Sequence, residues 1–569
     1  MIPNIAFSNR RAAPPPRPSP TRGERGARLL PFSRADQPAA PLPPVGRGWG
    51  WGARRWPKGA TIALVLLATP ALAQPDGAAI YADLCASCHA ETRLGGTGPA
   101  LIPESLGRLK GDKLAATIAD GRAMTQMPAF KDTLKPEEIA AVADFISTPL
   151  VAPVWGEAEI AGSRSLRDDY TPTAAPVFTA DPMNITLVVE TGDSHISVLD
   201  GDTFDVLDRF ETPFTVHGGP KFSSDGRYVF VMSRDGWVQK YDIWSLHEVG
   251  RVRAGLNSRN IAMSSDGKYL AVANYLPNTL TILNAGDLTV AKVFEVKGRN
   301  GDPTRVSAVY QAPERGTFVL ALKDVPEIWE VAFTEDGGPY SEGLVHSNEN
   351  GMEEAMGVEK GLFARRRIAV SAPLDDFFFS PDYRELIGAN REGETGVVVN
   401  LDVGREIASL PLSGMPHLGS GISWDRNGHR VVAIPHLNEG RISVIDMEDW
   451  SLIKTVETSG PGFFLRSHDG TPYLWADVFT GEHKGEMHII DKQSLEVVKV
   501  LKPEPGKTVA HTEFTRDGKY ALVSIWEMDG AVIVYDAATF KEIKRLPMVK
   551  PSGKYNVWNK ITFEDGTSH

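Results

Sequence analysis

The segment Cys85-Ala-Ser-Cys88-His89 contains both cysteines of the chain and has the spacing of a c-type haem attachment motif. In this motif two thiols three positions apart bond to the haem vinyl groups, and the adjacent histidine binds the iron. Met127, directly before a proline, is the predicted sixth ligand, with Met124 as the alternative. A His/Met pair raises the reduction potential and suits electron transfer. We therefore predict covalently bound haem c here, rather than a metal site or a thiol redox site.

Three further histidines and one arginine share a position relative to a recurring turn that ends in glycine. They lie 7 to 11 residues ahead of the turn glycine: His217 before Gly226, Arg259 before Gly267, His417 before Gly428 and His511 before Gly518. Histidine binds iron and exchanges protons near neutral pH. If the repeats stack side by side, the four side chains converge, and we expect them to surround a second redox cofactor.

The elements that must position these residues form a repeat of 42 to 45 residues from about residue 180 onward. Each unit has a β-rich run, a turn that opens with Asp or Asn, and a second β-rich run; these turn residues stand at 200, 242, 284, 402, 446, 491 and 536. The long gap after 284 holds a degenerate unit, EIWEVAFTEDG, and an insertion, YSEGLVHSNENGMEEAMGVEKG. Several short strands in a unit of this length are typical of a β-propeller. We predict eight blades, with seven as the alternative. The four shared residues are then expected in the loops that lead into the innermost strands, at one end of the axis.

The remaining histidines do not share this position, and we predict a solvated or structural role for each. They lie in or beside turns, within strands, in outer loops or at the chain end: His195, His247, His346, His429, His436, His468, His483, His488 and His569. Three glycines close to His417, namely Gly414, Gly419 and Gly421, are expected to let the backbone approach this second cofactor closely.

The first 73 residues differ from the rest of the chain. They are rich in Arg and Pro and end in ARRWPKGATIALVLLATPALA, whose basic start, apolar run and small-residue end are typical of a secretory signal cleaved after Ala73. The apolar run is too short for a comfortable membrane span. Because such a signal normally begins a chain, we expect the first 45 or so residues to be either untranslated or disordered.

The chain is too long for one compact core, so more than one domain is expected. We predict a leader and signal over 1–73, a helical class I cytochrome c domain over 74–150, a linker over 151–179 and the propeller over 180–569. The whole chain carries a net charge of −12 and residues 1–73 carry +9, so the remainder carries −21. An exported chain this acidic is not expected to bind nucleic acid or anionic lipid.

On these motifs, residues 76–569 resemble the family of cytochrome cd1 nitrite reductase and its relatives in haem d1 biosynthesis. That family joins a cytochrome c domain to an eight-bladed propeller that carries haem d1. TVHGG resembles the segment of the haem d1 ligand, which implies His217 in that role. MSRDG and NSRN resemble segments whose arginines bind the haem carboxylates, implying Arg234 and Arg259, and NYLP implies Tyr275 beside the macrocycle. PSGKYNVWN resembles the closing strand.

Two departures indicate a branch of the family. Nitrite reductase has two distal histidines that protonate its substrate; His417 corresponds to one, and Leu374 stands nearest to the other. Conversely, His511 stands where nitrite reductase usually has no histidine. This combination resembles the dihydro-haem d1 dehydrogenases, which convert a propionate of the immature macrocycle to an acrylate. We predict His511 as the base, Tyr555 as its partner or as a substrate-positioning group, and His417 as a second iron ligand.

Three alternatives stay open at this point. They are a nitrite reductase in which His346 moves into the site, a non-enzymatic haem d1 carrier, and an electron-transfer cytochrome with a structural propeller. Under the dehydrogenase interpretation the protein is periplasmic. It binds a tetrapyrrole substrate, haem d1 or its dihydro precursor, and passes electrons through haem c to a periplasmic acceptor. Nitrite reductase and other haem d1 maturation proteins are then expected partners; stable membrane insertion is not expected.

Overall fold

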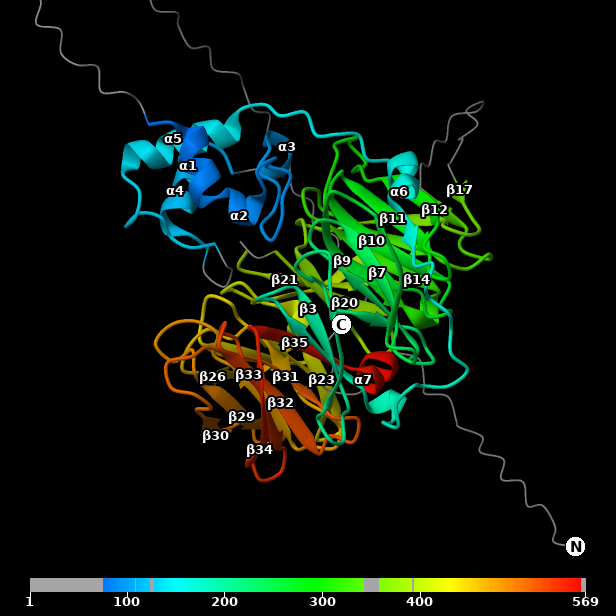
Figure 1. Ribbon diagram of the computed structural model, residues 1–569, viewed down its shortest axis with the longest axis vertical. Helices are drawn as coiled ribbons and strands as arrows, with labels where there is room; N and C mark the ends of the chain where they lie inside the picture. Colours follow the sequence, from blue (N-terminus) through cyan, green and yellow to red (C-terminus); the bar gives the residue numbers. More distant parts are fainter. Residues whose placement is uncertain (1–74, 108, 123–126, 342–357, 391–392, 564–569) are drawn as a thin grey trace, which may run out of the picture. The chain divides into compact units, whose positions relative to one another are not determined.

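The computed structural model describes residues 75–107, 109–122, 127–341, 358–390 and 393–563 (Figure 1). The predicted leader and signal, Met124, His346 and His569 lie outside these ranges. Residues 72–569 form one compact unit. Within the described ranges, none of the helices combines the length and the apolarity that crossing a membrane requires.

The N-terminal part is helical, as predicted. Its helices are α1 (Gly77–Leu84), α2 (Ala86–His89), α3 (Pro103–Leu106), α4 (Asp112–Asp120) and α5 (Pro136–Ser147). The Asp76 side chain accepts hydrogen bonds from two backbone N–H groups at the start of α1, and a proline occupies the first turn of α5. Buried residues of α1, α4 and α5, including Tyr81, Leu114 and Val142, form one apolar core. This core fixes the two ends of the domain against each other, with the cysteine motif between them.

The segment predicted as a linker, 151–179, contains ordered structure. Helix α6 (Glu157–Ser163) places Ile160 in the core of a neighbouring blade, and strand β1 (Ser165–Leu166) pairs with β8 (His247–Arg253). A short 3-10 helix, η1 (Pro182–Asn184), follows before the first blade. The chain is therefore attached to the propeller from about residue 155 onward.

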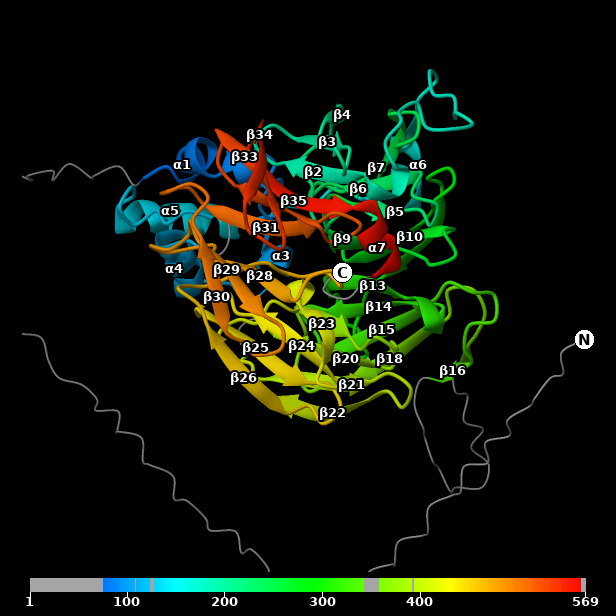
Figure 2. The same ribbon diagram turned by 90° about the horizontal axis from the view of Figure 1, so that it is seen from below.

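Eight antiparallel sheets follow one another around a common centre, which confirms the predicted eight-bladed propeller (Figure 2). The strands of each blade are given from the innermost strand outward. The first blade consists of β35 (Pro551–Asn556), β2 (Thr186–Glu190), β3 (His195–Leu199) and β4 (Val206–Glu211), and the second of β5 (Lys221–Phe222), β6 (Tyr228–Met232), β7 (Trp237–Asp242) and β8. The third consists of β9 (Asn257–Met263), β10 (Tyr269–Leu276), β11 (Thr279–Asn284) and β12 (Val290–Glu295), and the fourth of β13 (Val306–Ala312), β14 (Thr317–Leu322), β15 (Glu327–Ala332) and β18 (Arg365–Ala369).

The other four blades have the same order. They are β19 (Asp376–Phe379), β20 (Glu385–Ala389), β21 (Gly396–Asn400) and β22 (Arg405–Leu410); β23 (Ile422–Arg426), β24 (His429–Pro435), β25 (Arg441–Asp446) and β26 (Leu452–Glu457); β27 (Leu465–Arg466), β28 (Tyr473–Asp477), β29 (Met487–Asp491) and β30 (Val497–Leu501); and β31 (Val509–Phe514), β32 (Tyr520–Ile525), β33 (Gly530–Asp536) and β34 (Glu542–Met548). The C-terminal strand β35 pairs with β2, so the last strand closes the first blade. Helix α7 (Val557–Thr562) follows it, and η2 (Pro313–Arg315) and η3 (Leu418–Ser420) are short 3-10 turns.

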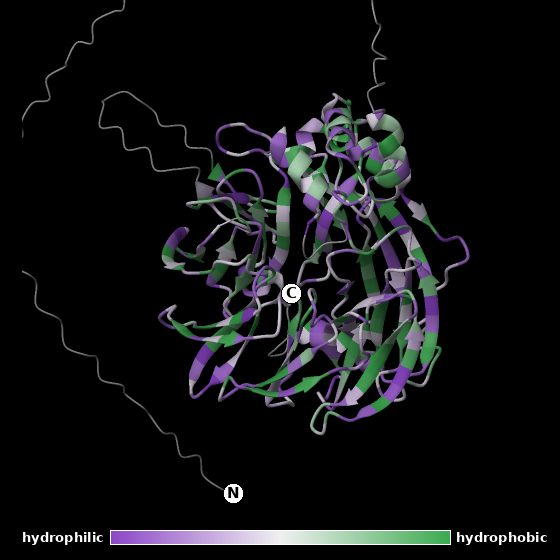
Figure 3. Ribbon diagram, turned by 90° about the vertical axis from the view of Figure 1, so that its left-hand side faces the viewer, coloured by the Kyte–Doolittle hydropathy of each residue, from purple (hydrophilic) through white to green (hydrophobic). Residues whose placement is uncertain are grey.

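The burial of the strands explains why most repeat units contain continuous apolar runs in the sequence. Both middle strands of the fourth blade, β14 and β15, are buried at every position, because neighbouring blades cover both of their faces. Outer strands such as β22 alternate between exposed and covered residues, as a strand with one solvated face does. Hydrophobic residues accordingly lie along the strands, and the connecting loops are mostly polar (Figure 3).

The recurring Asp-Gly turn joins the innermost strand to the second strand. In the turn after β5, Asp225 accepts a hydrogen bond from Ser223 Oγ (2.5 Å), and Gly226 has a φ of +70° that favours glycine. The turns before Gly267 and Gly518 repeat this arrangement. These turns define one end of the propeller, which we call the D-G face. The loops that lead into the innermost strands lie at the opposite end, which we call the mouth. The predicted insertion lies between β15 and β18 and includes a small hairpin of β16 (Tyr340–Ser341) and β17 (Val358–Glu359).

Candidate functional site

The haem attachment motif starts at the end of α1 and continues through α2, with its histidine turned inward. His89 is 6% exposed, and its Nδ1 donates a hydrogen bond to the Pro99 carbonyl oxygen at 2.8 Å. This bond puts the ring proton on Nδ1 and makes Nε2 the nitrogen with a lone pair, as an iron ligand requires. A Cβ at Gly98 would lie 2.5 Å from the ring, so this position needs glycine. Burial and the neighbouring Cys88 raise the pKa of the Cys85 thiol to about 11, which disfavours a thiolate redox or metal site.

Met127 lies in the loop between α4 and α5. Its carbonyl oxygen accepts a hydrogen bond from the Arg122 N–H (3.1 Å), and its side chain is half-buried. The role of Met127 as sixth ligand stays a prediction.

His217 is held at the mouth by backbone atoms of the second and third blades. Its backbone N–H donates to the Met232 carbonyl (3.0 Å), and its ring Nδ1 donates to the Arg259 carbonyl (2.6 Å). As in His89, the proton is thereby placed on Nδ1 and the lone pair is left on Nε2. The Arg259 Nη1 lies beside the ring, 2.8 Å from Nε2 and 3.1 Å from Nδ1. The ring is oriented by backbone atoms and carries a nitrogen that can bind iron, as the prediction requires.

Tyr275, at the end of β10, lies among four basic side chains. Burial by itself would raise the pKa of its hydroxyl, but the nearby cations outweigh this effect and lower that pKa. The four are Lys323, Arg259, Arg234 and Arg305. The guanidinium carbons of Arg234 and Arg305 lie 5.7 and 5.4 Å from the centre of the tyrosine ring. We call Arg234, Arg259, Tyr275, Arg305 and Lys323 the basic side of the mouth; it is suited to binding carboxylates.

Two members of the basic side, Arg305 and Lys323, were not predicted. Arg305 directly precedes β13 and lies 11 residues before Gly316, a glycine with a φ of +62°. His417 lies the same number of residues before its turn glycine, so this spacing could also have located Arg305. Lys323 follows β14 as Arg234 follows β6, in the turn between the second and third strands of a blade. Acidic residues accompany both: Arg305 pairs with Asp324 (2.6 Å) and Lys323 with Asp375.

His417 lies on the far side of the mouth in an aromatic environment. It is 8% exposed, and its Nδ1 donates to the Phe463 carbonyl oxygen at 2.8 Å, which again leaves the lone pair on Nε2. The rings of Phe463 and Phe464 lie 4.4 and 6.4 Å from its centre, and Phe464 lies 4.7 Å from the ring of His511. We call His417, Phe463, Phe464 and His511 the aromatic side. Phe463 lies 7 residues before Gly470 of an Asp-Gly turn, as His511 does before its own turn, so the repeat register could have located it too.

His511 lies inside strand β31, not in the loop before it. The pairing of β31 with β32 shifts between Ala510 and Thr512, so His511 is the extra residue of a β-bulge, with a left-handed φ of +47°. Arg259 likewise lies inside a strand, β9. The predicted lead-in loops are therefore correct for His217 and His417 and wrong for these two residues, because their innermost strands extend further toward the mouth.

The His511 side chain is fully buried and faces cations. Burial, followed by the charges of Arg466, Lys554 and Lys560, holds its pKa well below the ordinary histidine value, so the ring is neutral at neutral pH. Its backbone N–H donates to Asp477 Oδ2 (2.9 Å). The other oxygen of this carboxylate accepts from the N–H groups of Phe463 and Phe464 (2.7 and 2.9 Å), so Asp477 ties the aromatic loop to the bulge.

Tyr555 connects the two sides. It lies on the closing strand β35, its ring centre is 5.7 Å from that of His511, and its Cε1 would lie 3.1 Å from a Cβ built on Gly219. Burial raises the pKa of the Tyr555 hydroxyl to about 12, so it stays protonated. The structure thus brings Tyr555 to His511, as predicted, and to the loop of His217.

Three expectations about the surroundings of His417 are resolved by the structure. Gly414, Gly419 and Gly421 do not make room for a macrocycle, because a Cβ on each would meet protein atoms: Glu439, Asp376, and Leu418 with Phe378. His436 was predicted in an outer loop, but it is fully buried, bonded to Ser413 and Ser443, and burial lowers its pKa to about 4. Leu374 is 2% exposed in a blade core, so its side chain cannot replace a proton donor.

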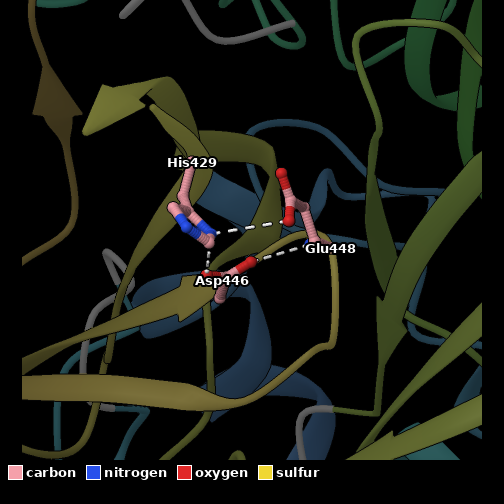
Figure 4. Close-up of side chains that lie close together, drawn as sticks. All are labelled: His429, Asp446 and Glu448. Atoms are coloured by element: carbon pink, nitrogen blue, oxygen red, sulfur yellow. Dashed lines mark hydrogen bonds and ion pairs between the residues drawn. The ribbon is translucent and has the colours of Figure 1, made fainter. Parts of the chain in front are cut away.

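The D-G face offers no better site among the described residues. His429 lies beside its turn glycine and pairs with Asp446 and Glu448 at 3.1 and 3.5 Å, with its side chain 55% exposed (Figure 4). This arrangement matches the predicted solvated role. A cavity of about 440 Å³ also opens at this face, and Ser264, Ser380 and Lys560 are among the described residues that line it. None of the predicted site residues is in that lining.

Comparisons with known proteins agree with this geometry. A family model described as "Cytochrome D1 heme domain" matches residues 180–346 and 359–560, and one described as "Cytochrome C oxidase, cbb3-type, subunit III" matches residues 73–146. A Pseudomonas aeruginosa "Dihydro-heme d1 dehydrogenase" is 48% identical over 513 residues, 90% of this chain and 99% of the relative.

More distant relatives and one solved structure extend the comparison. The "Protein NirF" of Pseudomonas aeruginosa is 27% identical over 64% of this chain and 89% of its own length. A "Nitrite reductase" of Stutzerimonas stutzeri is 23% identical over 85% of this chain and 92% of its own length. A solved structure described as "Dihydro-heme d1 dehydrogenase NirN in complex with DHE" is 48% identical with a TM-score of 0.70, and covers 85% of this chain and 100% of that one.

Proposed function

The chain belongs to the cytochrome D1 heme domain family, and from this membership we propose that it is a periplasmic dihydro-haem d1 dehydrogenase. It converts a propionate of its tetrapyrrole substrate to an acrylate. The observation that carries this function is the 48% identity to a dihydro-heme d1 dehydrogenase over 90% of the chain. Its support in the site is His511, a neutral, buried histidine on a β-bulge at the mouth, next to Tyr555.

Haem c is the resident cofactor in this proposal. Cys85 and Cys88 hold it covalently, and His89 and Met127 bind its iron. The fit is supported by the oriented ring of His89 and by the glycine packed against it. Bound haem c supplies a one-electron acceptor, from which a periplasmic partner takes the electrons.

The tetrapyrrole lies at the mouth as the substrate. His217 and His417 bind its iron, because in both residues the proton on Nδ1 is held by a backbone carbonyl. Arg234 and Arg259 bind its carboxylates, and Tyr275 lies beside the macrocycle. With both axial positions held by histidine, the iron has no site for nitrite, so the chemistry takes place at the edge of the macrocycle.

The reaction removes two hydrogens from a –CH₂–CH₂–COO⁻ side chain. Two C–H bonds break and one C=C bond forms, with release of two protons and two electrons. His511 accepts one proton, because its ring is neutral and its environment excludes water. Tyr555 stays protonated and orients the substrate or the His511 ring. The second proton passes to solvent, and the finished macrocycle passes to nitrite reductase or another haem d1 maturation protein.

A direct experiment tests this function. The purified protein with haem c attached is incubated without oxygen with dihydro-haem d1 and a one-electron acceptor, and the visible spectrum and the product mass are followed. We expect the loss of two hydrogens together with reduction of the acceptor. Tight binding without a mass change would leave the carrier function, and rapid conversion of nitrite to nitric oxide would leave the reductase.

A further inference from the structure

Arg466 is a buried arginine beside the proposed base. It ends the short innermost strand β27, in the blade next to that of His511, and is 4% exposed. Its Nη1 donates to the Leu465 carbonyl oxygen (2.9 Å), and its Nη2 lies 3.3 Å from His511 Nε2. The other ring nitrogen, Nδ1, accepts from the Lys554 backbone N–H (3.4 Å). The guanidinium therefore covers the ring nitrogen that would accept a proton from substrate.

The Arg466 guanidinium has no anionic partner in the described part of the chain. No carboxylate oxygen lies within 4.0 Å of it, and its buried Nε makes no hydrogen bond there. The two nearby acids accept hydrogen bonds from other groups, although Glu513 Oε2 makes none among the described residues. Asp477 accepts three backbone N–H groups, and Glu513 Oε1 accepts from the N–H of Phe514 (2.9 Å) and from Asn559 (3.0 Å).

A buried guanidinium without a carboxylate is costly, because the charge has lost water and gained little in return. Its five donors match a carboxylate in a two-pronged geometry. The proposed substrate brings a carboxylate to this place, since the side chain that is oxidised ends in one, two carbons from the macrocycle. The basic side cannot serve this group, because its arginines surround Tyr275 rather than His511.

We propose that Arg466 binds the carboxylate of the propionate that becomes the acrylate, and so places its C–H bond beside His511. This inference rests on the proposed function. Arg466 is a substrate-binding residue and changes neither the bonds broken nor the electrons released. When the guanidinium turns to the carboxylate, His511 Nε2 is uncovered. It accepts the proton of the C–H bond that breaks in the tautomer with the ring proton on Nδ1, which requires the Lys554 N–H contact to Nδ1 (3.4 Å) to open. The base is thus covered until the correct side chain arrives.

The test uses two forms of the substrate and four forms of the full-length protein with haem c attached. The substrates are dihydro-haem d1 and its analogue in which the reacting propionate is a methyl ester. The proteins are the wild type, Arg466→Gln, Arg466→Lys and a matched control, Arg430→Gln. Arg430 lies in a neighbouring blade near the D-G face, where it donates to Ser423 Oγ (3.0 Å). Binding is measured by absorption titration without an electron acceptor, and turnover is measured separately with one.

We expect the wild type and Arg430→Gln to bind the acid about 10- to 100-fold more tightly than the ester, as a charge-assisted pair predicts. Arg466→Gln should bind both forms equally, at the affinity of the wild type for the ester, and Arg466→Lys should restore part of the preference. If Arg466→Gln keeps the wild-type preference for the acid, the inference is wrong and Arg466 has only a structural role between the two blades. Thermal melting and the haem c spectrum show whether each variant is folded, and Arg466→Lys still decides the matter if the glutamine variant is not.

Failure of the proposed function gives a different result. A wild type that binds the acid more tightly than the ester but never removes two hydrogens would contradict the dehydrogenase and keep a carboxylate site at Arg466. A wild type that removes two hydrogens, together with an Arg466→Gln variant of unchanged affinity and KM, would keep the dehydrogenase and remove Arg466 from substrate binding.

Discussion

The two sides of the mouth are built from different blades and have opposite chemical character. The basic side comes from the second, third and fourth blades and gathers four cations around Tyr275. The aromatic side comes from the sixth, seventh and eighth blades and surrounds two histidines with Phe463 and Phe464. His217, which is bonded through Nδ1 to the carbonyl of Arg259 on the basic side, matches His417 of the aromatic side, whose Nδ1 is bonded to the Phe463 carbonyl.

This difference separates recognition from chemistry. Cations around an aromatic ring attract carboxylates whatever the oxidation state of the side chains that carry them, so the basic side holds substrate and product alike. The aromatic side excludes water and keeps His511 neutral, which matters only while a proton is transferred. A bulge occurs on both sides, at Arg259 and at His511, but the left-handed φ of His511 and the buried acid Asp477 belong to the second side, where positions must be held accurately.

Removing the base should give the largest effect. His511→Ala is expected to slow dehydrogenation by about 10²- to 10⁴-fold, the range for loss of a general base, while dihydro-haem d1 still binds. Single-turnover absorption measures the rate, and titration measures the affinity. His429→Ala, at the exposed D-G face, is the control and should keep the wild-type rate. A His511→Ala enzyme that keeps the wild-type rate would show that another residue of the mouth is the base.

Removing one cation from the basic side should weaken substrate binding and leave the rate of dehydrogenation nearly unchanged. Arg234→Gln is expected to raise the Kd for dihydro-haem d1 by about 10-fold, the loss of one charge-assisted hydrogen bond, with kcat within about two-fold of wild type. Steady-state kinetics separate KM from kcat. The division of the mouth into two sides fails if kcat falls by the larger factor.

The pH dependence should show the depressed pKa of His511. Burial and the charges of Arg466, Lys554 and Lys560 favour the neutral ring, and the neutral ring is the base, so activity is kept as pH falls below 6.5. A base with an ordinary pKa of 6.5 loses about four-fold in kcat/KM between pH 7.5 and pH 6.0, and we expect a loss of less than two-fold. Asp477, whose pKa burial raises to about 6, is the other group that titrates near this range. A midpoint at pH 6.5 in kcat/KM would mean that His511 is open to water in the protein without substrate.

The smallest effect is expected from removing one phenyl ring of the aromatic side. Phe464→Leu removes the ring between His417 and His511 but keeps an apolar side chain. We expect kcat to fall by about two- to ten-fold, as the loss of one aromatic contact would give, with Kd nearly unchanged. The matched substitution Phe540→Leu, in an outer turn of the eighth blade, should leave both constants as they are. A ten-fold rise in Kd instead would make Phe464 part of the binding surface.

Local chemistry made much of this protein predictable. The haem c motif is contiguous, and the recurring turns contain left-handed glycines such as Gly226, Gly267, Gly428 and Gly518. The number of blades and the register of His217 and His417 could therefore be inferred from the repeat. The same count points to Arg305 and Phe463, although it does not say why they matter. It also predicted loops where strands exist at Arg259 and His511, because a bulge depends on the partner strand.

The sequence by itself determined the haem c motif and the propeller, since these follow from turns, periods and spacings along the chain. The closure by the last strand was implied by the resemblance of PSGKYNVWN to the closing strand of the family, and the structure shows it. Only the tertiary structure decided the character of the mouth. Tyr555 meets the loop of His217 from the opposite end of the chain, and Arg466 meets His511 from the neighbouring blade. Such contacts arise when eight blades close into a ring, and their charges shift pKa values only once burial has removed water from around them.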